Sequence, residues 1–264
     1  MDDLIDCIRS LLEEVDFKVH LFVRDAKSED YIIKENIDSV FSSASLIKVP
    51  LLIAVLDYVE QNNLSLDTEI KITSENKVDF SVVTEQDLEK STLYELLVWM
   101  IITSDNSATN VLIDFVGMNE LNTYFNKIGL TETKLQRKMM DFERMDQGFD
   151  NVTTARDMAY LYSRIYQQNL LKQYNPLVID ILCRQRVHEV LKRYISDDVQ
   201  IAHKTGSLDT VCHDVGIIYL DTKDYIIGVF TTDLHDVVAA QKVIGRISKI
   251  VYEYYRLEER RSTS

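Results

Sequence analysis

The two ends of this chain carry strand-like patterns, while its long middle section carries helical ones. Apolar and polar residues alternate over residues 17–36, where a short polar turn interrupts them, and again in three segments within 199–234. That alternation is the two-residue period of β-strands. From residue 44 to about 195, apolar residues instead recur at three- and four-residue spacing, as in helices. We therefore predict one sheet built from both ends of the chain, with a helical lobe inserted between them.

The predicted fold class is α+β, an α/β sandwich with an antiparallel sheet and an all-helical lobe. With 264 residues, 7 Gly and 2 Pro, the chain is long enough for one large domain and carries no linker composition. We expect a single domain over 1–264, with a sheet lobe from about 1–43 and 199–264 and a helical lobe from about 44–198. A polar, irregular stretch at 131–152 is typical of a functional loop. A cleft between the lobes is the expected place for an active site.

Charge and cysteine content exclude several classes of function. The net charge is −14, which opposes binding to nucleic acid because phosphates are bound mainly by Lys and Arg. The three cysteines, Cys7, Cys183 and Cys212, are far apart and odd in number, which favours reduced thiols over a disulfide framework.

The sequence as written carries neither a membrane-spanning pattern nor a secretory signal pattern. No uninterrupted apolar stretch reaches the roughly 18–20 residues that span a bilayer, so no membrane span is expected. The acidic start, MDDLIDCIRSLLEEVD, lacks the basic region and long apolar core of a secretory signal. We expect a cytoplasmic protein, or an extracellular or periplasmic one if an export signal is removed before Met1.

One lysine stands at the head of an unusually apolar helical segment. Ser45 and Lys48 are three residues apart in SASLIKVPLLIAVL, and so lie on one face of a helix. At the first turn the serine gains from the positive end of the helix dipole. A lysine desolvated against Leu46, Val49 and Leu51 is a better base at neutral pH, because burial disfavours its charged form. The pair is therefore a candidate nucleophile with its activator.

A Ser-x-x-Lys tetrad by itself is weak evidence, because about one is expected by chance in such a chain. A second copy, Ser74 with Lys77, lies in a polar stretch without an apolar helix, and we interpret it as coincidence. Two further motifs change this balance. Ser104-Asp105-Asn106 interrupts a long helical segment, and Lys204-Thr205-Gly206 stands where a strand begins near the C-terminus.

These three motifs, in this order, are the signature of class A β-lactamases and penicillin-binding proteins. The chain resembles that serine-hydrolase superfamily over nearly its whole length, including FSSASLIKVP, MIITSDNSATN, NVTTARDMA and AHKTGSLDTVCHDVGIIYL. The resemblance implies a serine β-lactamase/transpeptidase-like fold. It also implies that Ser45 is the acylated nucleophile and that Lys48 accepts its proton.

The resemblance assigns roles to the other motif residues as well. Ser104 would relay a proton to the leaving nitrogen, and Asn106 would hold Lys48 and the substrate amide. Lys204 and Thr205 would bind the substrate carboxylate, while Gly206 would let the strand approach the acyl group. The backbone N–H groups of Ser45 and Ser207 would form an oxyanion hole.

The chain departs from the family pattern in the polar loop. Class A enzymes carry there a glutamate that activates the water for hydrolysis of the acyl-enzyme, and Met139 stands at that position. Glu143 falls at the position of a family asparagine, and Asp141 is close by. Glu143 is therefore our candidate for the deacylating base, and it requires a rearranged loop.

The second departure follows the Lys-Thr-Gly motif. Cys212 stands where many class A enzymes have an arginine that contacts the substrate carboxylate. Arg184, Arg186 or His213 are candidates to replace it. We expect no metal and no cofactor, and interpret His203 and His213 as hydrogen-bonding residues rather than ligands.

The leading interpretation is a class A β-lactamase-type serine hydrolase that opens the β-lactam amide through an acyl-serine, with weak deacylation. One alternative is a D-alanyl-D-alanine carboxypeptidase or small-ester hydrolase. Another is a penicillin-binding sensor that acylates and stalls. In each case the partner is a small β-lactam or acyl-peptide, with no nucleic acid and no membrane span, and the sequence sets no oligomeric state.

Overall fold

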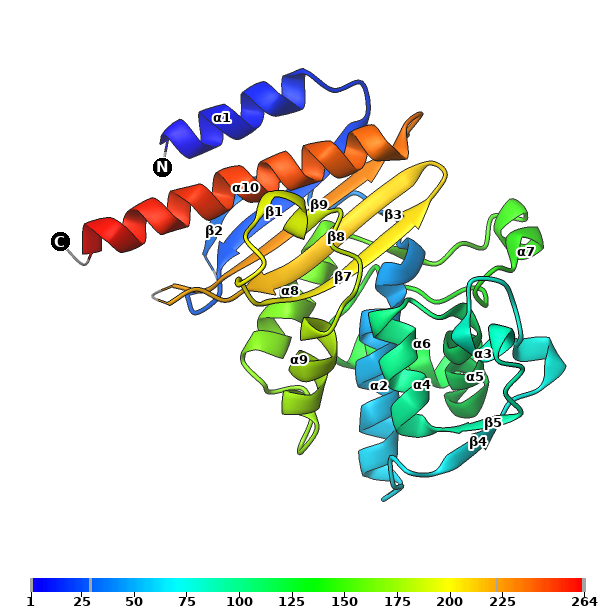
Figure 1. Ribbon diagram of the computed structural model, residues 1–264. Helices are drawn as coiled ribbons and strands as arrows, with labels where there is room; N and C mark the ends of the chain where they lie inside the picture. The colour runs from blue at the N-terminus through cyan, green and yellow to red at the C-terminus, as the bar shows by residue number, and fades with distance from the viewer. Residues whose placement is uncertain (1, 29, 222, 263–264) are drawn as a thin grey trace.

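The computed structural model describes residues 2–28, 30–221 and 223–262 and is built around one five-stranded antiparallel sheet. The strand order is β2-β1-β9-β8-β7, so strands from the two ends of the chain pair at the centre of the sheet (Figure 1). This confirms the predicted fold class. The strands are β1 (Lys18–Asp25), β2 (Tyr31–Glu35), β7 (Ile201–Leu208), β8 (Val211–Ile218) and β9 (Tyr225–Thr232).

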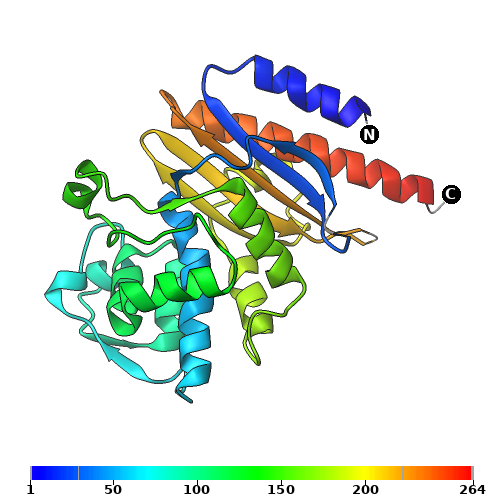
Figure 2. The same cartoon turned by 180° about the vertical axis from the view of Figure 1, so that it is seen from behind.

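Both faces of the sheet are covered, which explains its nearly continuous burial. Helices α1 (Asp2–Glu13) and α10 (Val237–Ser262) lie along one face, and the two described chain ends lie at the same end of the molecule (Figure 1). Helix α8 (Ala155–Tyr166) packs on the other face, as the view from behind shows (Figure 2). Along β1, Leu21 packs into the apolar cluster that contains residues of α1 and α10. The next residue, Phe22, packs into the cluster on the other face, which contains residues of α2 and α8. Side chains that alternate between two faces are what a two-residue period requires.

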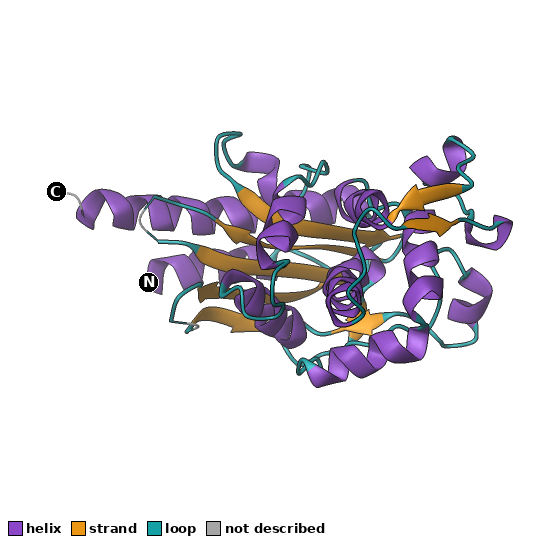
Figure 3. Ribbon diagram, turned by 90° about the horizontal axis from the view of Figure 1, so that it is seen from below, coloured by secondary structure: helices purple, strands orange, loops and turns teal. Residues whose placement is uncertain are grey.

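The helical lobe is organised around α2 (Lys48–Gln61). Ten of its residues are buried, beginning with Lys48 itself. It contacts α4 (Leu93–Ile102), α5 (Asn106–Val116) and α6 (Met118–Lys127), and the lobe stands beside the sheet in Figure 3. A helix that is apolar on all sides is stable only inside such a bundle.

Short elements complete the described chain. The strand pairs are β3 (Phe41–Ser42) with β6 (Val152–Thr153) and β4 (Glu69–Lys71) with β5 (Lys90–Thr92). The remaining helices are α3 (Val82–Glu85), α7 (Phe142–Asp146), α9 (Asn175–Cys183) and the 3-10 helices η1 (Ala44–Ile47), η2 (Ser74–Asn76) and η3 (Leu191–Tyr194). None of the helices in the described ranges is long and apolar enough to cross a membrane.

The structure corrects one helix prediction. The apolar pattern over 176–194 predicts a continuous helix, but α9 ends at Cys183 and η3 starts only at Leu191. The buried side chain of Gln185 donates to the Ile101 carbonyl in α4 and accepts from the two backbone N–H groups that follow it. These bonds give the backbone a non-helical alternative, and they tie the segment to the lobe that carries the active site.

Asp105 fixes the junction between α4 and α5. Its side chain is almost fully buried and caps α5 by accepting from the Ala108 N–H at 2.8 Å. It also accepts from Ser81 Oγ at 2.8 Å and from the Val83 N–H at 3.3 Å. The middle residue of the Ser-Asp-Asn motif thus joins α5 to the segment around α3.

We predict that Asp105→Ala lowers the free energy of unfolding by about 3 kcal/mol, because a helix cap is lost and buried donors lose their acceptor. Urea unfolding monitored by circular dichroism measures this. The control is Asp146→Ala, which changes an exposed carboxylate of α7 and should cost less than about 0.5 kcal/mol. Equal stability of the two variants would show that Asp105 does not hold the junction.

Candidate active site

Ser45 lies in the 3-10 turn η1, immediately before α2, rather than in the first turn of the α-helix as predicted. The preceding residue, Ala44, has a φ of 43°, a left-handed conformation that alanine rarely adopts. Ser43 anchors the turn, because its N–H donates to the Asn151 carbonyl at 2.8 Å. The strained, anchored turn leaves Ser45 half-buried at a cleft.

Lys48 joins the first two motifs. Its side chain is fully buried, and Nζ donates to Ser104 O at 2.7 Å, to Ser104 Oγ at 3.1 Å and to Asn106 Oδ1 at 2.8 Å. The contact with Asn106 is the one that the resemblance implied, whereas the two bonds to Ser104 were not foreseen. Burial and the charge of Lys204 nevertheless lower the pKa of Lys48 well below its ordinary value, against the opposing effect of Asp105.

Lys204 brings the third motif to the same serine. Its Nζ lies 3.1 Å from Ser104 Oγ and donates to Thr205 O at 2.7 Å. Burial lowers the pKa of Lys204 to about 7, although the Asp214 carboxylate favours the charged form. Ser104, held at a left-handed φ of 57°, therefore has its hydroxyl oxygen between two buried lysine nitrogens.

Gly206 lets strand β7 come close to the nucleophile turn. A Cβ atom at this residue would stand 3.0 Å from Ser45 N and 3.1 Å from Ser43 O, both backbone atoms that cannot easily move. The next residue, Ser207, is exposed at the cleft. Only glycine permits this approach, which brings the strand's backbone near the Ser45 N–H as an oxyanion hole requires.

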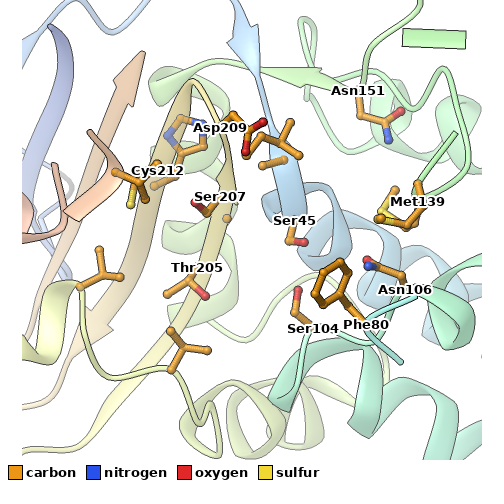
Figure 4. A pocket seen from close by; sticks show the side chains of 18 of the residues that line it. Ser45, Phe80, Ser104, Asn106, Met139, Asn151, Thr205, Ser207, Asp209 and Cys212 are labelled. Atoms are coloured by element: carbon orange, nitrogen blue, oxygen red, sulfur yellow. The ribbon is translucent and has the colours of Figure 1, made fainter. Parts of the chain in front are cut away.

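The motif residues meet at a cleft with a volume of about 540 Å³ between the sheet and the helical lobe. Ser45, Ser104 and Asn106 line it from the helical lobe, and Thr205 and Ser207 line it from β7. Figure 4 shows Ser45 between these two groups, with Met139 and Asn151 on the side of Asn106. Lys48 and Lys204 lie behind this surface, fully buried.

Met139 lines the cleft where the resemblance places a glutamate. Its backbone is fixed by Asn110, whose Oδ1 accepts from Met139 N at 2.7 Å and whose Nδ2 donates to Met139 O at 3.2 Å. The loop is closed by the ion pair between Arg137 Nε and Asp150 Oδ1 at 2.8 Å. The thioether is thus held in place at the cleft.

The loop is not rearranged to bring Glu143 to the site. Glu143 lies exposed in α7 and is not among the described residues that line the cleft. Asp141 is occupied as the N-cap of α7, where it accepts from Arg144 N. Neither carboxylate is therefore positioned as a base in this structure.

None of the three candidates replaces the missing arginine as a cation at the cleft. Arg184 is exposed and pairs with Asp180 at 3.2 Å, and Arg186 is exposed without lining the cleft. His213 does line it, but its Nε2 lies 2.9 Å from Ser42 O and its Nδ1 accepts from Thr231 N. Burial lowers the pKa of His213 to about 4, so it is neutral at pH 7.

The second Ser-x-x-Lys copy has a structural explanation. Ser74 belongs to the short helix η2, which a reciprocal capping box between Thr73 and Asn76 stabilises. Lys77 pairs with Asp87, and neither Ser74 nor Lys77 lines the cleft. The described residues also hold no group of three or more His, Cys, Asp or Glu side chains that could bind a metal.

Sequence reasoning did not find the residues that hold the site residues in place. Asn110 and Asn151 donate to backbone carbonyls and Asp150 pairs with the Arg137 side chain, contacts that leave no sequence pattern. Phe80 gave a weak signal, an aromatic residue in a polar stretch. It lies 78% exposed at the mouth of the cleft with a φ of 56°.

A serine on a strained turn, with buried lysines in place of histidine, is the arrangement of a serine hydrolase that works through an acyl-enzyme. Comparison with known proteins identifies the family. The model of the Beta-lactamase enzyme family matches residues 3–255, and the chain belongs to that family.

Curated relatives and solved structures agree with this. A beta-lactamase from Bacteroides uniformis is 25% identical, with 97% of this chain and 92% of the relative covered. Beta-lactamase VEB-1 from Pseudomonas aeruginosa is 24% identical, with 96% and 91% covered. The structure of PBP-A superposes with a TM-score of 0.87 at 25% identity, covering 96% of each chain. A PBP-A mutant, solved as an acyl-enzyme complex with penicillin G, gives 0.88 at 25% identity and 97% coverage of each.

We predict that Lys204→Met raises the free energy of unfolding at pH 7 by about 1–4 kcal/mol, because a buried cation is replaced by an apolar side chain of similar size. The folded pKa of about 7 lies below the ordinary 10.5. Between these values the unfolded chain binds the proton more tightly, so wild-type stability rises with pH and the advantage of the variant shrinks.

Thermal unfolding of both proteins between pH 6 and 10 measures this difference. Lys90→Met is the control, because the Lys90 side chain is 65% exposed and its removal should change stability little at any pH. A Lys204→Met variant less stable than wild type at pH 7 would show that the bonds to Ser104 and Thr205 outweigh the cost of burying the charge.

Proposed function

We propose that Ser45 attacks the amide carbonyl of a β-lactam and forms an acyl-serine ester. The observation that carries this proposal is the placement of one hydroxyl oxygen, Ser104 Oγ, 3.1 Å from the nitrogens of both Lys48 and Lys204. The named relatives support the substrate class, since they are beta-lactamases, and one similar structure is a penicillin G acyl-enzyme.

The proton in this step moves through Lys48 and Ser104. Neutral Lys48 takes the proton of Ser45 Oγ as the new C–O bond forms. The negative charge on the carbonyl oxygen is stabilised by the backbone N–H groups of Ser45 and Ser207. Ser104 then gives its proton to the departing nitrogen and regains one from Lys48, so the proton of Ser45 ends on the nitrogen whose bond to carbon breaks.

Hydrolysis of the ester needs a second base, and the cleft supplies none near Met139. A thioether neither positions nor deprotonates water. Among the described residues that line the cleft, the one carboxylate is Asp209. Asp209 lies on the Ser207 side of Ser45, away from Met139 (Figure 4). We therefore propose that acylation outruns deacylation.

The same observation favours a second candidate function. A protein that binds penicillin covalently and stalls, as a sensor or as a carboxypeptidase with another natural substrate, needs no base at the position of Met139. Incubation with a chromogenic cephalosporin followed by intact mass separates the candidates. Turnover without a stable adduct indicates an efficient β-lactamase, slow turnover with an accumulating adduct indicates the slow deacylation that we propose, and an adduct that persists without turnover indicates the second candidate.

We predict that Ser45→Ala abolishes labelling by a fluorescent penicillin, while Ser74→Ala leaves it unchanged, because only Ser45 lies at the cleft with a lysine network behind it. Gel fluorescence and intact mass measure the labelling. Ser74→Ala is the matched control, since it removes the same atom from the other Ser-x-x-Lys copy. Labelling that persists in Ser45→Ala would overturn the assignment of the nucleophile.

We predict that Met139→Glu raises steady-state turnover of a penicillin by about 10²-fold or more without changing the acylation burst, because it restores a general base beside the ester. Stopped-flow kinetics separates the two phases. The wild type should show a burst followed by slow turnover, and Glu143→Gln should behave like wild type. Fast, burst-free wild-type turnover that collapses in Glu143→Gln would instead make Glu143 the deacylating base.

A further inference from the structure

Beside the strand that carries the Lys-Thr-Gly motif lies a buried carboxylate that the proposed reaction does not use. Asp214 belongs to β8 and stands directly opposite Thr205 in the pairing of β7 with β8 (Figure 1). Its two oxygens lie 2.9 and 3.1 Å from His203 Nδ1, and Oδ2 accepts from the Leu191 N–H at 3.0 Å. Asp214 is fully buried, and His203 is 1% exposed. These contacts replace the hydration that a buried carboxylate loses.

Gly216 makes room for the imidazole of this pair. It is the ladder partner of His203, and a Cβ atom at Gly216 would stand 2.6 Å from His203 Cβ and 2.9 Å from Ala202 O. Both distances are too short for a real side chain, so only glycine fits here. The two strands and η3 therefore hold His203 and Asp214 in one arrangement.

Three of the ionisable side chains around Asp214 are uncharged at pH 7. Burial, with Asp214 as a further cause, raises the pKa of Tyr162 in α8 well above its ordinary value. The same two causes raise the pKa of the Cys212 thiol to about 12. Burial lowers the pKa of His213 to about 4. None of these three side chains therefore balances the charge of Asp214.

The other cationic side chains near the pair are engaged elsewhere. His188 lies with its ring centroid 6.3 Å from that of His203, and its Nε2 is 2.8 Å from a backbone carbonyl. Lys192 and Arg193 of η3 donate to backbone carbonyls of their own segment. The lysine on which Asp214 acts is therefore the one in the adjacent strand.

That lysine is Lys204. Its side chain turns the opposite way from Asp214, because side chains alternate along a strand, and it reaches Ser104 at the cleft. Neighbouring strands lie only about 4.8 Å apart, and both groups are fully buried, so water screens their attraction little. Burial lowers the pKa of Lys204 to about 7, and Asp214 opposes this effect by favouring the ammonium form.

The charge of Lys204 matters because the described lining of the cleft offers a substrate no other free cation. Arg137 is bound in the ion pair of the loop, and His213 is neutral. Cys212 stands where the resemblance places an arginine. Thr205 lines the cleft in front of Lys204. A carboxylate of the substrate at this strand therefore depends on Lys204 for its opposite charge.

We propose that Asp214, held by His203 and the Leu191 N–H, is a positioning residue that keeps Lys204 charged, so that β7 can take a free carboxylate of the acyl donor. This rests on the proposed acylation of Ser45 and specifies how pH controls the substrates of that site. Without the charge of Asp214 the pKa of Lys204 falls further, so the ammonium form is lost at a lower pH. A pair that only stabilised the fold would not change that pH.

The test follows acylation by two forms of one chromogenic cephalosporin, the free carboxylate and its methyl ester, between about pH 5.5 and 8.5. Stopped-flow measurement gives the second-order rate constant for each form, which reports the ionisation of the free protein. The ratio of acid to ester cancels the protonation of Lys48, because both forms need the same base. In the wild type we expect this ratio to fall by about tenfold as the pH rises. Its midpoint should lie near pH 7, where Lys204 loses its proton.

Asp214→Asn should lower this midpoint by at least about half a pH unit, because it removes the negative charge and keeps the shape. The matched control is Asp209→Asn, the same change at an exposed carboxylate of the β7–β8 turn, where water screens the charge. His188→Gln removes the other ionisable ring beside the pair. Both controls should keep the wild-type midpoint.

Two variants of His203 replace Asp214→Asn if that variant does not fold. His203→Asn keeps a donor at the position of Nδ1 and should keep the midpoint. His203→Leu removes the donor, so the buried carboxylate takes up a proton more readily, and the midpoint should fall. Equal midpoints in these two variants would overturn the role of the pair.

The outcomes separate this proposal from the one on which it rests. If neither form acylates Ser45, the proposed function itself fails. If both forms acylate Ser45 but their ratio is constant with pH, the acylation stands and the role of Asp214 is wrong. The same conclusion follows if Asp214→Asn loses stability but keeps the wild-type midpoint.

Discussion

The active site depends on two lysines that are both fully buried and share one serine oxygen. Lys48 comes from the start of the central helix and Lys204 from an edge strand of the sheet, and Ser104 Oγ lies 3.1 Å from each nitrogen. Burial first, and the nearby charge of Lys204 second, keep the pKa of Lys48 low. The surrounding fold supplies the compensation, through Asp105 near Lys48 and Asp214 near Lys204. The two lobes are thus coupled electrostatically beside Ser45, the nucleophile that we propose.

The loop that closes the cleft has the frame that the resemblance implies but a different side chain at its key position. Its frame is intact, because the Arg137–Asp150 ion pair and the Asn110 bonds hold Met139 at the cleft. Only the side chain presented there differs from the catalytic glutamate. The residues to which we assign acylation are all in place, whereas the position to which the resemblance assigns the base for ester hydrolysis is occupied by Met139. Cys212, which stands where the resemblance places an arginine, is a second such change, on the opposite side of Ser45 (Figure 4).

Several predictions from the sequence depended on local patterns and therefore succeeded. Alternation over 17–36 predicted the β1–β2 hairpin, and the order of the three motifs predicted the family, which the match over residues 3–255 confirms. The continuous helix over 176–194 was wrong, because Gln185 bonds to a carbonyl 84 residues away in sequence. The local pattern around Lys48 showed only its apolar neighbours, and the resemblance was needed to assign Asn106 to it, a contact that the structure contains. The oxygens that Lys48 meets come from residues 56 and 58 positions further along the chain.

The sequence by itself determined the fold class, the nucleophile candidate and the two departures at Met139 and Cys212, because periodicity and short motifs are local properties of a chain. Only the tertiary structure decided whether neighbours in sequence are neighbours in the site. Glu143 is four residues from Met139, yet it lies exposed on α7, because its helix turns it away from the cleft. Lys204 is 100 residues from Ser104, yet the two are in contact. Contacts of this kind arise from packing two lobes against each other, which no spacing within either lobe encodes.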